Sequence, residues 1–365
     1  MSSTQQSLEG LLEGAEVIVC CGSGGVGKTT TAAALGLQAA RLGRRAVVVT
    51  IDPAKRLADA LGVPGGLGND PIRLSLDDEG EHGGELWALM LDTATTFDGL
   101  VVANAASPEQ AERILANRFY HNVAGSLSGT QEYMAAERLH ALHLDPRFDL
   151  VIVDTPPTRS ALDFLDAPGT LARFIDHPLF RLMMMPTRRG LKVLNLATQP
   201  VLRTIGRVVG GEVLTDAIAF FQAFAGMETG FRHRADEVIA LLHGPATHFL
   251  LVASPRADTI DEALYFAGRL RATGLAVSAV VVNRCTPDFG PAPSRRPRSA
   301  ELAALDDNLA ELHATARAER RQAGALLADP AIADDTPTTF VPTLAGDVHT
   351  MAALESIRAA LFDAT

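Results

Sequence analysis

The sequence predicts an α/β fold in which a mostly parallel β-sheet is covered by helices on both faces and carries helical insertions. Two observations predict this fold. Short apolar runs alternate along the chain with longer helical patterns, which is typical of a parallel sheet buried on both faces. The first apolar run leads directly into a glycine-rich loop and then a helix, so one edge of the sheet is expected to bind a ligand.

The composition limits the class of protein. The chain has 365 residues, 47% hydrophobic and 21% charged, which is enough apolar material for a globular core. A net charge of −11 argues against binding nucleic acid through charge. The three cysteines, Cys20, Cys21 and Cys285, form no C-x-x-C pair for zinc or redox chemistry, and we expect no disulfide framework. With no signal peptide and no apolar stretch of roughly 18 residues, the chain is expected to be cytoplasmic.

Six apolar runs are predicted as strands, at residues 15–21, 45–52, 86–92, 148–158, 247–255 and 275–284. An alanine- and leucine-rich helix is predicted from Lys28 to about Gly43. Two regions, about 93–145 and 166–244, have helical character and break the alternation. No linker composition separates them from the rest. We therefore predict one domain over residues 1–365 with two helical insertions.

The stretch GSGGVGKTT, residues 22–30, has the phosphate-loop pattern G-x-x-x-x-G-K-[ST] between a strand and a helix. Glycines let backbone N–H groups turn toward phosphate oxygens, and the helix N-terminus favours an anion. Lys28 is expected to reach the outer phosphates and the Thr29 hydroxyl to ligate Mg²⁺. This pattern predicts a P-loop NTPase. The predicted nucleotide-binding residues of the loop are Gly22, Ser23, Gly24, Gly25, Val26, Gly27, Lys28, Thr29 and Thr30.

Two aspartates stand at the ends of predicted strands, on the sheet edge where the phosphate loop also lies. Asp154 follows four apolar residues and is predicted to lie near Mg²⁺. Asp52 is predicted either to orient the attacking water or to lie in the outer shell of the metal. A helix cap or a turn is the alternative for each, since Asp-Pro favours turns. Their position beside a phosphate loop favours the functional interpretation.

Three segments together resemble the deviant-Walker-A ATPases of the arsenite-pump type, a group that includes the ATPases that target tail-anchored membrane proteins. The segments are GSGGVGKTT (22–30), DPAKRLAD (52–59) and DTPPTRSALDFL (154–165). Residues 247–284 resemble the late strand–helix–strand unit of the family. FVPTLAGDVHTMAAL (340–354) resembles its adenine-side loop and closing helix. The resemblance spans residues 15 to about 360.

The resemblance implies an Mg²⁺-dependent ATPase that works as a dimer, with two ATP molecules facing each other at the interface. Asp52 falls in the first switch segment, where it would activate the water, and Asp154 opens the second. Asn283 falls where the family recognises adenine. Taken alone, Asn283 is more often a turn former, although its amide has the donor and acceptor that an adenine edge needs. The turn expected to close over the base comprises Val341, Pro342 and Thr343.

The chain departs from the family at Ser23, which occupies the position of the signature lysine. In the family that lysine reaches the partner's phosphates, so the chain looks like a bacterial member that lacks it. Arg159 and Ser160 stand where tail-anchor and arsenite members have Gly-His, and Lys55 and Arg56 add charge to the first switch. The cysteines expected for arsenite binding are not evident.

Three accounts of Ser23 stay open. In the first, a paralogous partner retains the lysine and the two chains form a heterodimer. In the second, Arg159, Lys55 or Arg56 supplies the positive charge, as an arginine finger does. In the third, the chain binds ATP, hydrolyses it poorly and acts as a nucleotide-gated switch. We rank the heterodimer first because the rest of the catalytic set is intact. In every account Lys28, Asp52 and Arg159 are the candidate catalytic residues, and Thr29, Asp52 and Asp154 the candidate metal ligands.

The second insertion lies where tail-anchor members form a groove for a transmembrane segment. Its apolar residues either line such a groove or pack the helical layer. They include Met183, Met184, Met185, Phe220, Phe221 and Phe224. The expected function is an ATPase whose hydrolysis drives dimer switching and the handling of a membrane-protein client or a partner. The alternatives are a non-hydrolysing regulatory subunit, an arsenite-translocating subunit and a partition-type positioning ATPase.

Overall fold

The computed structural model describes residues 7–52, 56–76, 83–121, 130–176, 211–291, 299–344 and 346–363. The chain divides into two compact units. The first, called the sheet unit below, comprises residues 1–90, 142–162 and 244–365, and the second, the helical unit, comprises residues 91–141 and 163–243. The assignment of the whole chain to one domain with two insertions stays a prediction.

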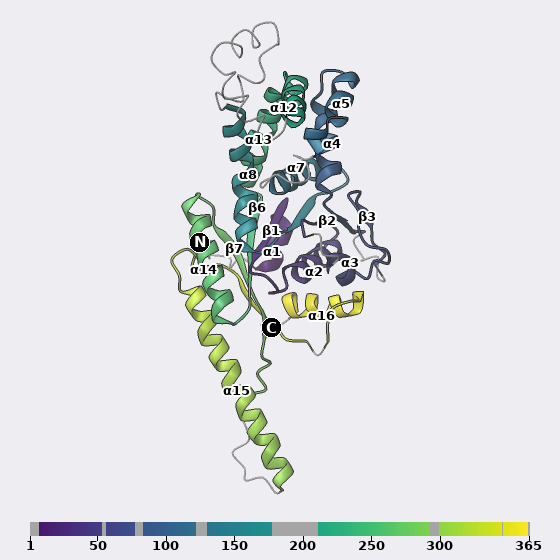
Figure 1. Cartoon of the computed structure of the whole chain (residues 1–365). Coiled ribbons are helices and arrows are strands. Elements are labelled where there is room, and N and C mark those ends of the chain that lie inside the picture. The colour runs from purple at the N-terminus through teal and green to yellow at the C-terminus, as the bar shows by residue number, and fades with distance from the viewer. Residues whose placement is uncertain are drawn as a thin grey trace, which may run out of the picture. The chain divides into compact units, whose positions relative to one another are not determined.

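The described part of the sheet unit contains one eight-stranded sheet with the order β3-β4-β2-β5-β1-β6-β7-β8 (Figure 1). Neighbouring strands pair in parallel except for β3 and β4. The α/β fold with a mostly parallel sheet is therefore confirmed. The strands are β1 (Val17–Gly22), β2 (Arg45–Thr50), β3 (Ile72–Arg73), β4 (Glu85–Met90), β5 (Leu150–Asp154), β6 (Thr247–Ala253), β7 (Val277–Cys285) and β8 (Thr338–Pro342).

All six strands predicted from apolar runs are present as β1, β2, β4, β5, β6 and β7. No apolar run marks β3 or β8, which lie at the two edges of the sheet. β3 has two residues, too few for an apolar run. β8 reads TTFVP and ends at Pro342, and a proline lowers the strand signal although it is tolerated on an edge strand.

Both faces of the sheet are buried, because alternate residues of a strand point to opposite faces. In β1, Ile18 and Cys20 belong to a cluster with helix α2 (Lys28–Arg41) and the C-terminal helix α16 (Met351–Phe362). Val17 and Val19, which alternate with them, are also fully buried. Helix α14 (Ala257–Ala272) contacts β1 and β6. The near-continuous apolar strands follow from this two-sided burial. Three short or peripheral helices of the same unit are α1 (Leu8–Gly14), α3 (Arg56–Ala60) and α15 (Ala300–Leu327).

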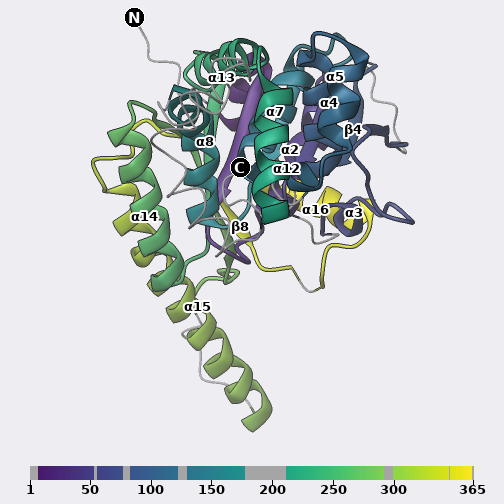
Figure 2. The ribbon, with the colours of Figure 1, turned by 45° about the horizontal axis from the view of Figure 1, so that its top comes forward.

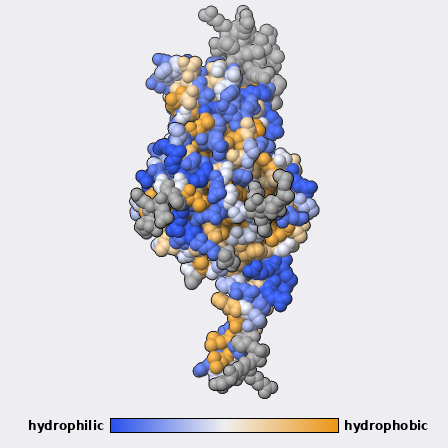
Figure 3. All heavy atoms as spheres, turned by 180° about the vertical axis from the view of Figure 1, so that it is seen from behind, coloured by the Kyte–Doolittle hydropathy of each residue, from blue (hydrophilic) through white to orange (hydrophobic). Residues whose placement is uncertain are grey.

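Helix α15 extends beyond the rest of the sheet unit (Figures 1 and 2). Its buried residues, Ala316, Ala323 and Leu326, all lie in its C-terminal half, where it contacts α14 and β7. In its N-terminal half Leu302 and Leu305 are 47% and 62% exposed. Figure 3 shows hydrophobic atoms on this projecting part.

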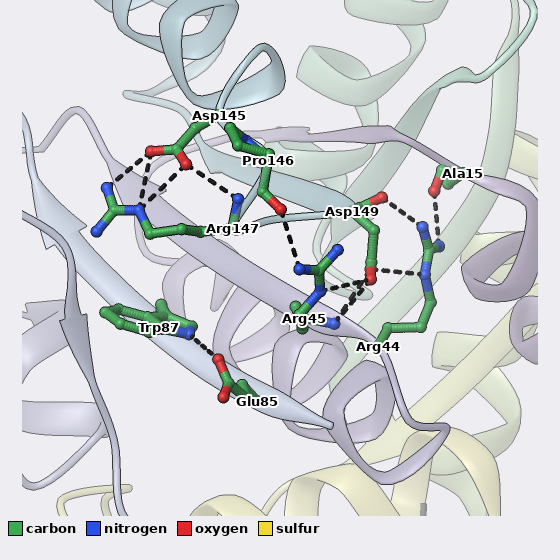
Figure 4. A network of polar contacts seen from close by, with 9 residues as sticks. All are labelled: Ala15, Arg44, Arg45, Glu85, Trp87, Asp145, Pro146, Arg147 and Asp149. Carbon is green, nitrogen blue, oxygen red and sulfur yellow. Dashed lines mark hydrogen bonds and ion pairs between the residues drawn. The ribbon is translucent and has the colours of Figure 1, made fainter. Parts of the chain in front are cut away.

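A polar network holds the amino ends of β2 and β5 together (Figure 4). The Arg44 guanidinium donates to the carbonyl oxygens of Leu12, Ala15 and Asp149, and to the Asp149 carboxylate at 3.2 Å. Arg45 donates to the same carboxylate and to the Pro146 carbonyl, 2.9 Å away. These contacts lie at the strand ends opposite the phosphate loop, so they stabilise the sheet without occupying its ligand-binding edge.

In the helical unit, the consecutive helices α4 and α5 both begin at side-chain caps. Asp92 caps α4 by accepting from the backbone N–H of Thr95 at 2.7 Å, and Ser107 caps α5 just before Pro108. None of the helices among the described residues is both long and apolar enough to cross a membrane. The helices of this unit are α4 (Thr93–Asn104), α5 (Pro108–Leu115), α12 (Gly211–Phe224), α13 (Glu228–Leu242) and most of α7 (Thr130–His143) and α8 (Thr158–Asp176), whose residues 142–143 and 158–162 belong to the sheet unit.

The phenylalanines of α12 pack inside the helical unit. Phe220, Phe221 and Phe224 are each less than 10% exposed and belong to one cluster with Tyr120 and Phe231. The ring centroids of Phe224 and Phe231 are 4.9 Å apart. The core interpretation therefore holds for these three side chains in this structure. Met183, Met184 and Met185 lie outside the described residues.

Candidate functional site

The phosphate loop joins the carboxyl end of β1 to the N-terminus of α2. Gly22, the last residue of β1, allows close packing against β6, since a Cβ there would lie 2.0 Å from the Val252 carbonyl oxygen. Gly27 precedes the first turn of α2 in the left-handed conformation, with φ of 97°. Residues other than glycine rarely adopt this backbone conformation. The glycine pattern is therefore a geometric requirement of this turn, and it leaves the first N–H groups of α2 facing a prospective anion.

Lys28 is buried at the start of α2, with 7% of its surface exposed. Its ammonium group donates to the carbonyl oxygen of Ser23 at 2.8 Å. Burial lowers the pKa of Lys28, and the nearby Asp154 carboxylate partly opposes that shift. The loop thus holds a buried cation at the point where phosphate is predicted to bind.

Asp154, at the end of β5, lies beside the loop and is 1% exposed. Its Oδ2 atom accepts hydrogen bonds from the hydroxyls of Thr29 at 2.8 Å and Thr50 at 2.9 Å. Its Oδ1 atom is buried and has no hydrogen-bond partner among the described residues. Burial raises the pKa of Asp154 to about 6, although the bonds from both threonines oppose the shift. Asp154 therefore contacts Thr29, the other residue at this point that is predicted to bind Mg²⁺, and the binding of metal by either residue stays a prediction.

Thr50 is a site residue that sequence reasoning missed. It lies opposite Asp154 in the parallel pairing of β2 and β5. Its hydroxyl donates to Asp154 and accepts from the backbone N–H of Asp52 at 3.2 Å. Thr50 therefore connects the starts of the two predicted switch segments. Threonine is an ordinary strand former, so the available signal was its position two residues before Asp52 at a strand end.

Asp52 follows β2 at the same edge of the sheet. Its side chain is 23% exposed and accepts from the guanidinium of Arg56, four positions further along the chain, at 3.3 Å. Arg56 therefore forms an ion pair with the carboxylate of Asp52, a candidate catalytic residue. Lys55 lies outside the described residues. Arg159 is the second residue of α8, and its side chain lies outside the described part of the structure.

Asn283 and the segment 341–343 lie on neighbouring strands. The Asn283 amide nitrogen donates to the Val26 carbonyl oxygen in the phosphate loop at 2.8 Å. The Thr343 N–H donates to the Cys285 carbonyl at 2.8 Å, and Val341 is buried. Asn283 therefore contacts the loop itself in this structure. Its predicted role, with Val341, Pro342 and Thr343, at the adenine stays a prediction.

The oxygen atoms at the site fit Mg²⁺. This ion is usually held in nucleotide sites by one or two protein oxygens together with phosphates and water, so a cage of carboxylates is not needed. Accordingly, the described residues contain no cluster of three or more acidic, His or Cys side chains able to hold a metal. Thr29 and Asp154 provide hard oxygen ligands, and the unpartnered Asp154 Oδ1 is a buried acceptor that an ion would satisfy. The carboxylate of Asp52, the third candidate ligand, accepts a hydrogen bond from Arg56.

A parallel sheet whose first strand ends in a phosphate loop, with an aspartate at the end of the adjacent strand, defines a P-loop nucleotide-binding fold. The model of the anion-transporting ATPase family matches residues 15–296, which is more than half of the chain. The chain therefore belongs to the anion-transporting ATPase family.

Similar proteins include the uncharacterized protein SCO2128 of Streptomyces coelicolor, 31% identical over 76% of this chain and 64% of that protein. A putative arsenical pump-driving ATPase 1 of Aquifex aeolicus is 26% identical over 74% of this chain and 64% of its own length. The ATPase get3 of Schizosaccharomyces japonicus is 27% identical over 76% of this chain and 78% of its own. The chain spans less than two thirds of the length of the first two.

Proposed function

We propose that this chain is an Mg²⁺-dependent ATPase that binds ATP at the phosphate loop. The observation that carries the proposal is the arrangement around Asp154. Its Oδ2 atom is bonded to Thr29, and its buried Oδ1 atom is left without a partner beside the loop. A buried acceptor costs free energy unless a ligand satisfies it. Asp154 and Thr29 would hold a cation here, and that cation would satisfy the acceptor and neutralise charge on a bound nucleotide.

Each residue of the site has a defined task in this proposal. Lys28 transfers its hydrogen bond from the Ser23 carbonyl to a phosphate oxygen, so its buried charge gains an anionic partner. Thr29 and Asp154 hold the ion, which when bound neutralises charge on the phosphates. Thr50 keeps Asp154 oriented through its hydroxyl. Asp52 orients a water molecule for attack, after its carboxylate exchanges Arg56 for that water.

The missing signature lysine makes the source of the final positive charge part of the proposal. Ser23 is 7% exposed, and its carbonyl oxygen accepts a hydrogen bond from Lys28. Because the serine side chain is short and uncharged, this position offers no positive charge to a partner subunit. A heterodimer with a paralogue that retains the lysine remains our first account, ahead of Arg159, Lys55 or Arg56 acting in its place. The third account is a chain that binds ATP and acts as a switch without efficient turnover. Arg56 has a specific observation in its favour, because it already contacts Asp52.

Hydrolysis is proposed to drive a dimer, either homodimeric or formed with a paralogous ATPase subunit, between two states through the two switch segments. Thr50 supports this coupling because it bonds to the first residues of both segments. A membrane-protein client, as in tail-anchor targeting, and a cytoplasmic location complete the proposal. Nucleic acid is not a proposed partner, given the net charge of −11.

An arsenite-translocating subunit is the alternative suggested by the arsenical-pump relative. The cysteines of this chain do not favour it. Cys20 and Cys21 are buried, and burial raises the pKa of both thiols, whereas soft metal binding needs a thiolate. Cys285 lies on β7, and burial raises its pKa to about 11.

The test is titration of the purified chain with a fluorescent ATP analogue, with and without Mg²⁺. We expect binding that Mg²⁺ strengthens in the wild type and in the Thr29→Ser variant, which keeps the hydroxyl. The Thr29→Val variant, which has the same shape but no hydroxyl, should lose the Mg²⁺ effect. Absence of nucleotide binding by the wild type would refute the proposal.

A second measurement separates the accounts of Ser23. If the chain alone hydrolyses ATP rapidly and Arg56→Ala or Arg159→Ala abolishes turnover while ATP still binds, the charge comes from that arginine and the heterodimer account is wrong. If turnover appears only when a paralogue is added, the heterodimer account is supported. If ATP binds and no condition gives turnover, the chain is a nucleotide-gated switch.

A further inference from the structure

We propose that Asn283 is a positioning residue of the phosphate loop, and that it fixes the direction of a phosphate-binding N–H group. The inference rests on the proposed binding of nucleotide at this loop. Asn283 lies on β7 and is 8% exposed, and its Nδ2 atom donates to the Val26 carbonyl oxygen at 2.8 Å. This bond connects residues that are 257 positions apart in the chain.

The loop is shaped to admit the Asn283 amide. A Cβ atom on Gly27 would lie 2.2 Å from Nδ2 of Asn283, so a residue with a side chain at position 27 would displace the amide. Gly27 also has φ of 97°. The second glycine of the motif is therefore required twice, once by its backbone conformation and once by the approach of Asn283.

The local backbone of β7 holds the amide in this direction. The Asn283 Oδ1 atom accepts from the N–H of Arg284 at 2.9 Å. Arg284 has φ of 61°, the one positive value among the described residues other than glycine. The pairing of β7 with β8 shifts register between Val282 and Cys285 at this point. A strained residue and a bulge at the end of a strand re-aim a side chain, and here the side chain they aim is Asn283.

The consequence follows from the geometry of the peptide bond. In a trans peptide the C=O and the N–H point in opposite directions. The Val26 carbonyl faces Asn283, so the N–H of Gly27, in the same peptide unit, points away from Asn283. In a phosphate loop the N–H groups on that side provide the anion-binding cradle. Asn283 thus selects the peptide orientation in which Gly27 donates to phosphate.

This role differs from recognition of the base. A base-reading residue changes the preference between ATP and GTP and has no effect on a ligand that lacks a base. A residue that orients the loop changes the affinity for every ligand that carries the phosphates. One Asn can do both, because its second N–H and its remaining oxygen lone pair stay available. The phosphate effect is the new claim.

The experiment compares inorganic tripolyphosphate, ATP and GTP as ligands of the full chain, in the presence of Mg²⁺, by calorimetric titration. For Asn283→Ala we expect the affinity for tripolyphosphate to fall by about tenfold, the effect of losing one buried hydrogen bond to an ordering contact. ATP should lose at least as much. The matched control is Asn104→Ala in the helical unit, because the Asn104 amide also donates to a carbonyl, that of Leu100 at 2.9 Å, and packs against a glycine, Gly230.

The control should keep wild-type affinity for all three ligands, and unfolding curves of both variants should show that each is folded at the titration temperature. If Asn283→Ala binds tripolyphosphate as the wild type does and only its ATP-to-GTP preference changes, Asn283 reads the base and the proposal is wrong. If the wild type binds neither tripolyphosphate nor ATP, the proposed ATPase function itself fails. The two failures are therefore distinguishable.

Discussion

The ammonium group of Lys28 and the carbonyl oxygen of Ser23 are 2.8 Å apart, and both residues are only 7% exposed. The backbone of the phosphate loop therefore accepts a hydrogen bond from the lysine of the same loop. Burial lowers the pKa of Lys28, while Asp154, Cys21, Cys20 and Asp52 oppose that shift. A buried ammonium group held in this way lowers the free energy of unfolding, and it lies where phosphate is proposed to bind.

Replacing Lys28 with methionine, which has a similar length and no charge, should separate binding from stability. We expect roughly a 100-fold loss of affinity for Mg²⁺-ATP, since a charge-assisted hydrogen bond to phosphate is lost. The free energy of unfolding without nucleotide should change by less than about 1 kcal/mol, because a buried charge is removed together with its bond. Arg41→Met, further along the same helix and 39% exposed, is the control. Retained affinity in the Lys28 variant would show that the loop does not bind phosphate through this residue.

The raised pKa of Asp154 predicts a pH-dependent stability. Its pKa in the folded chain is about 6, above the ordinary 3.8, so the folded state keeps this proton between those values while the unfolded chain releases it. The ionised form therefore destabilises the nucleotide-free chain above pH 6, and this penalty disappears as the pH falls toward 4.

The Asp154→Asn variant has no such penalty. Without Mg²⁺ or nucleotide, its free energy of unfolding at pH 7.5 should be about 2–3 kcal/mol higher than that of the wild type. The difference should shrink below pH 6. Urea unfolding across this pH range measures it. A difference that stays constant with pH would mean that Asp154 is ionised at all these values in the folded chain.

The hydroxyl of Thr50 should control the ionisation of Asp154. Thr50→Val removes a hydrogen bond that lowers the pKa of Asp154, so that pKa should rise further. We expect the acid limb of the pH profile of kcat/KM for ATP to move about one unit to higher pH, so that the rate falls about twofold at pH 7 and about tenfold at pH values well below 6. Thr50→Ser keeps the hydroxyl and should restore the wild-type profile. Equal acid limbs for the serine and valine variants would contradict a role of the hydroxyl.

The network at the far ends of the strands should affect stability and leave the site alone. Arg44 is 17% exposed and donates to three backbone carbonyls, whereas its neighbour Arg45 is 46% exposed. Arg44→Met removes the donor of three hydrogen bonds to partly buried carbonyls, at a cost of about 2–4 kcal/mol of unfolding free energy. Arg45→Met should cost less than about 1 kcal/mol. ATP affinity should be unchanged in both, and a large loss of affinity in either would place this network in the nucleotide site.

The phosphate loop and Asp154 could be found from sequence because each has a local signature. The loop has fixed glycine spacing, and Asp154 follows a buried apolar strand. The six apolar strands have the same advantage, since burial on both faces leaves a continuous hydrophobic run. β3 and β8 lie at the edges, where burial is incomplete and the signal disappears.

Thr50 and the loop contact of Asn283 could not be found this way. Thr50 is an ordinary strand residue until the pairing of β2 with β5 sets it opposite Asp154. The bond from Asn283 to Val26 depends on a bulge in β7 and on the absence of a side chain at Gly27. Both contacts depend on the tertiary structure, and no pattern in a single sequence indicates them.

Hydrolysis of ATP is proposed to occur at the site formed by Lys28, Thr29 and Asp154. It can be measured as single-turnover phosphate release with enzyme in excess, on the purified chain and again with a candidate paralogue present. We expect Mg²⁺-dependent release of phosphate by the wild type in at least one of the two conditions, with loss of this release in Thr29→Val and retention in Thr29→Ser. Equal phosphate release by the wild type and the Thr29→Val variant, or none by the wild type in either condition, would contradict it.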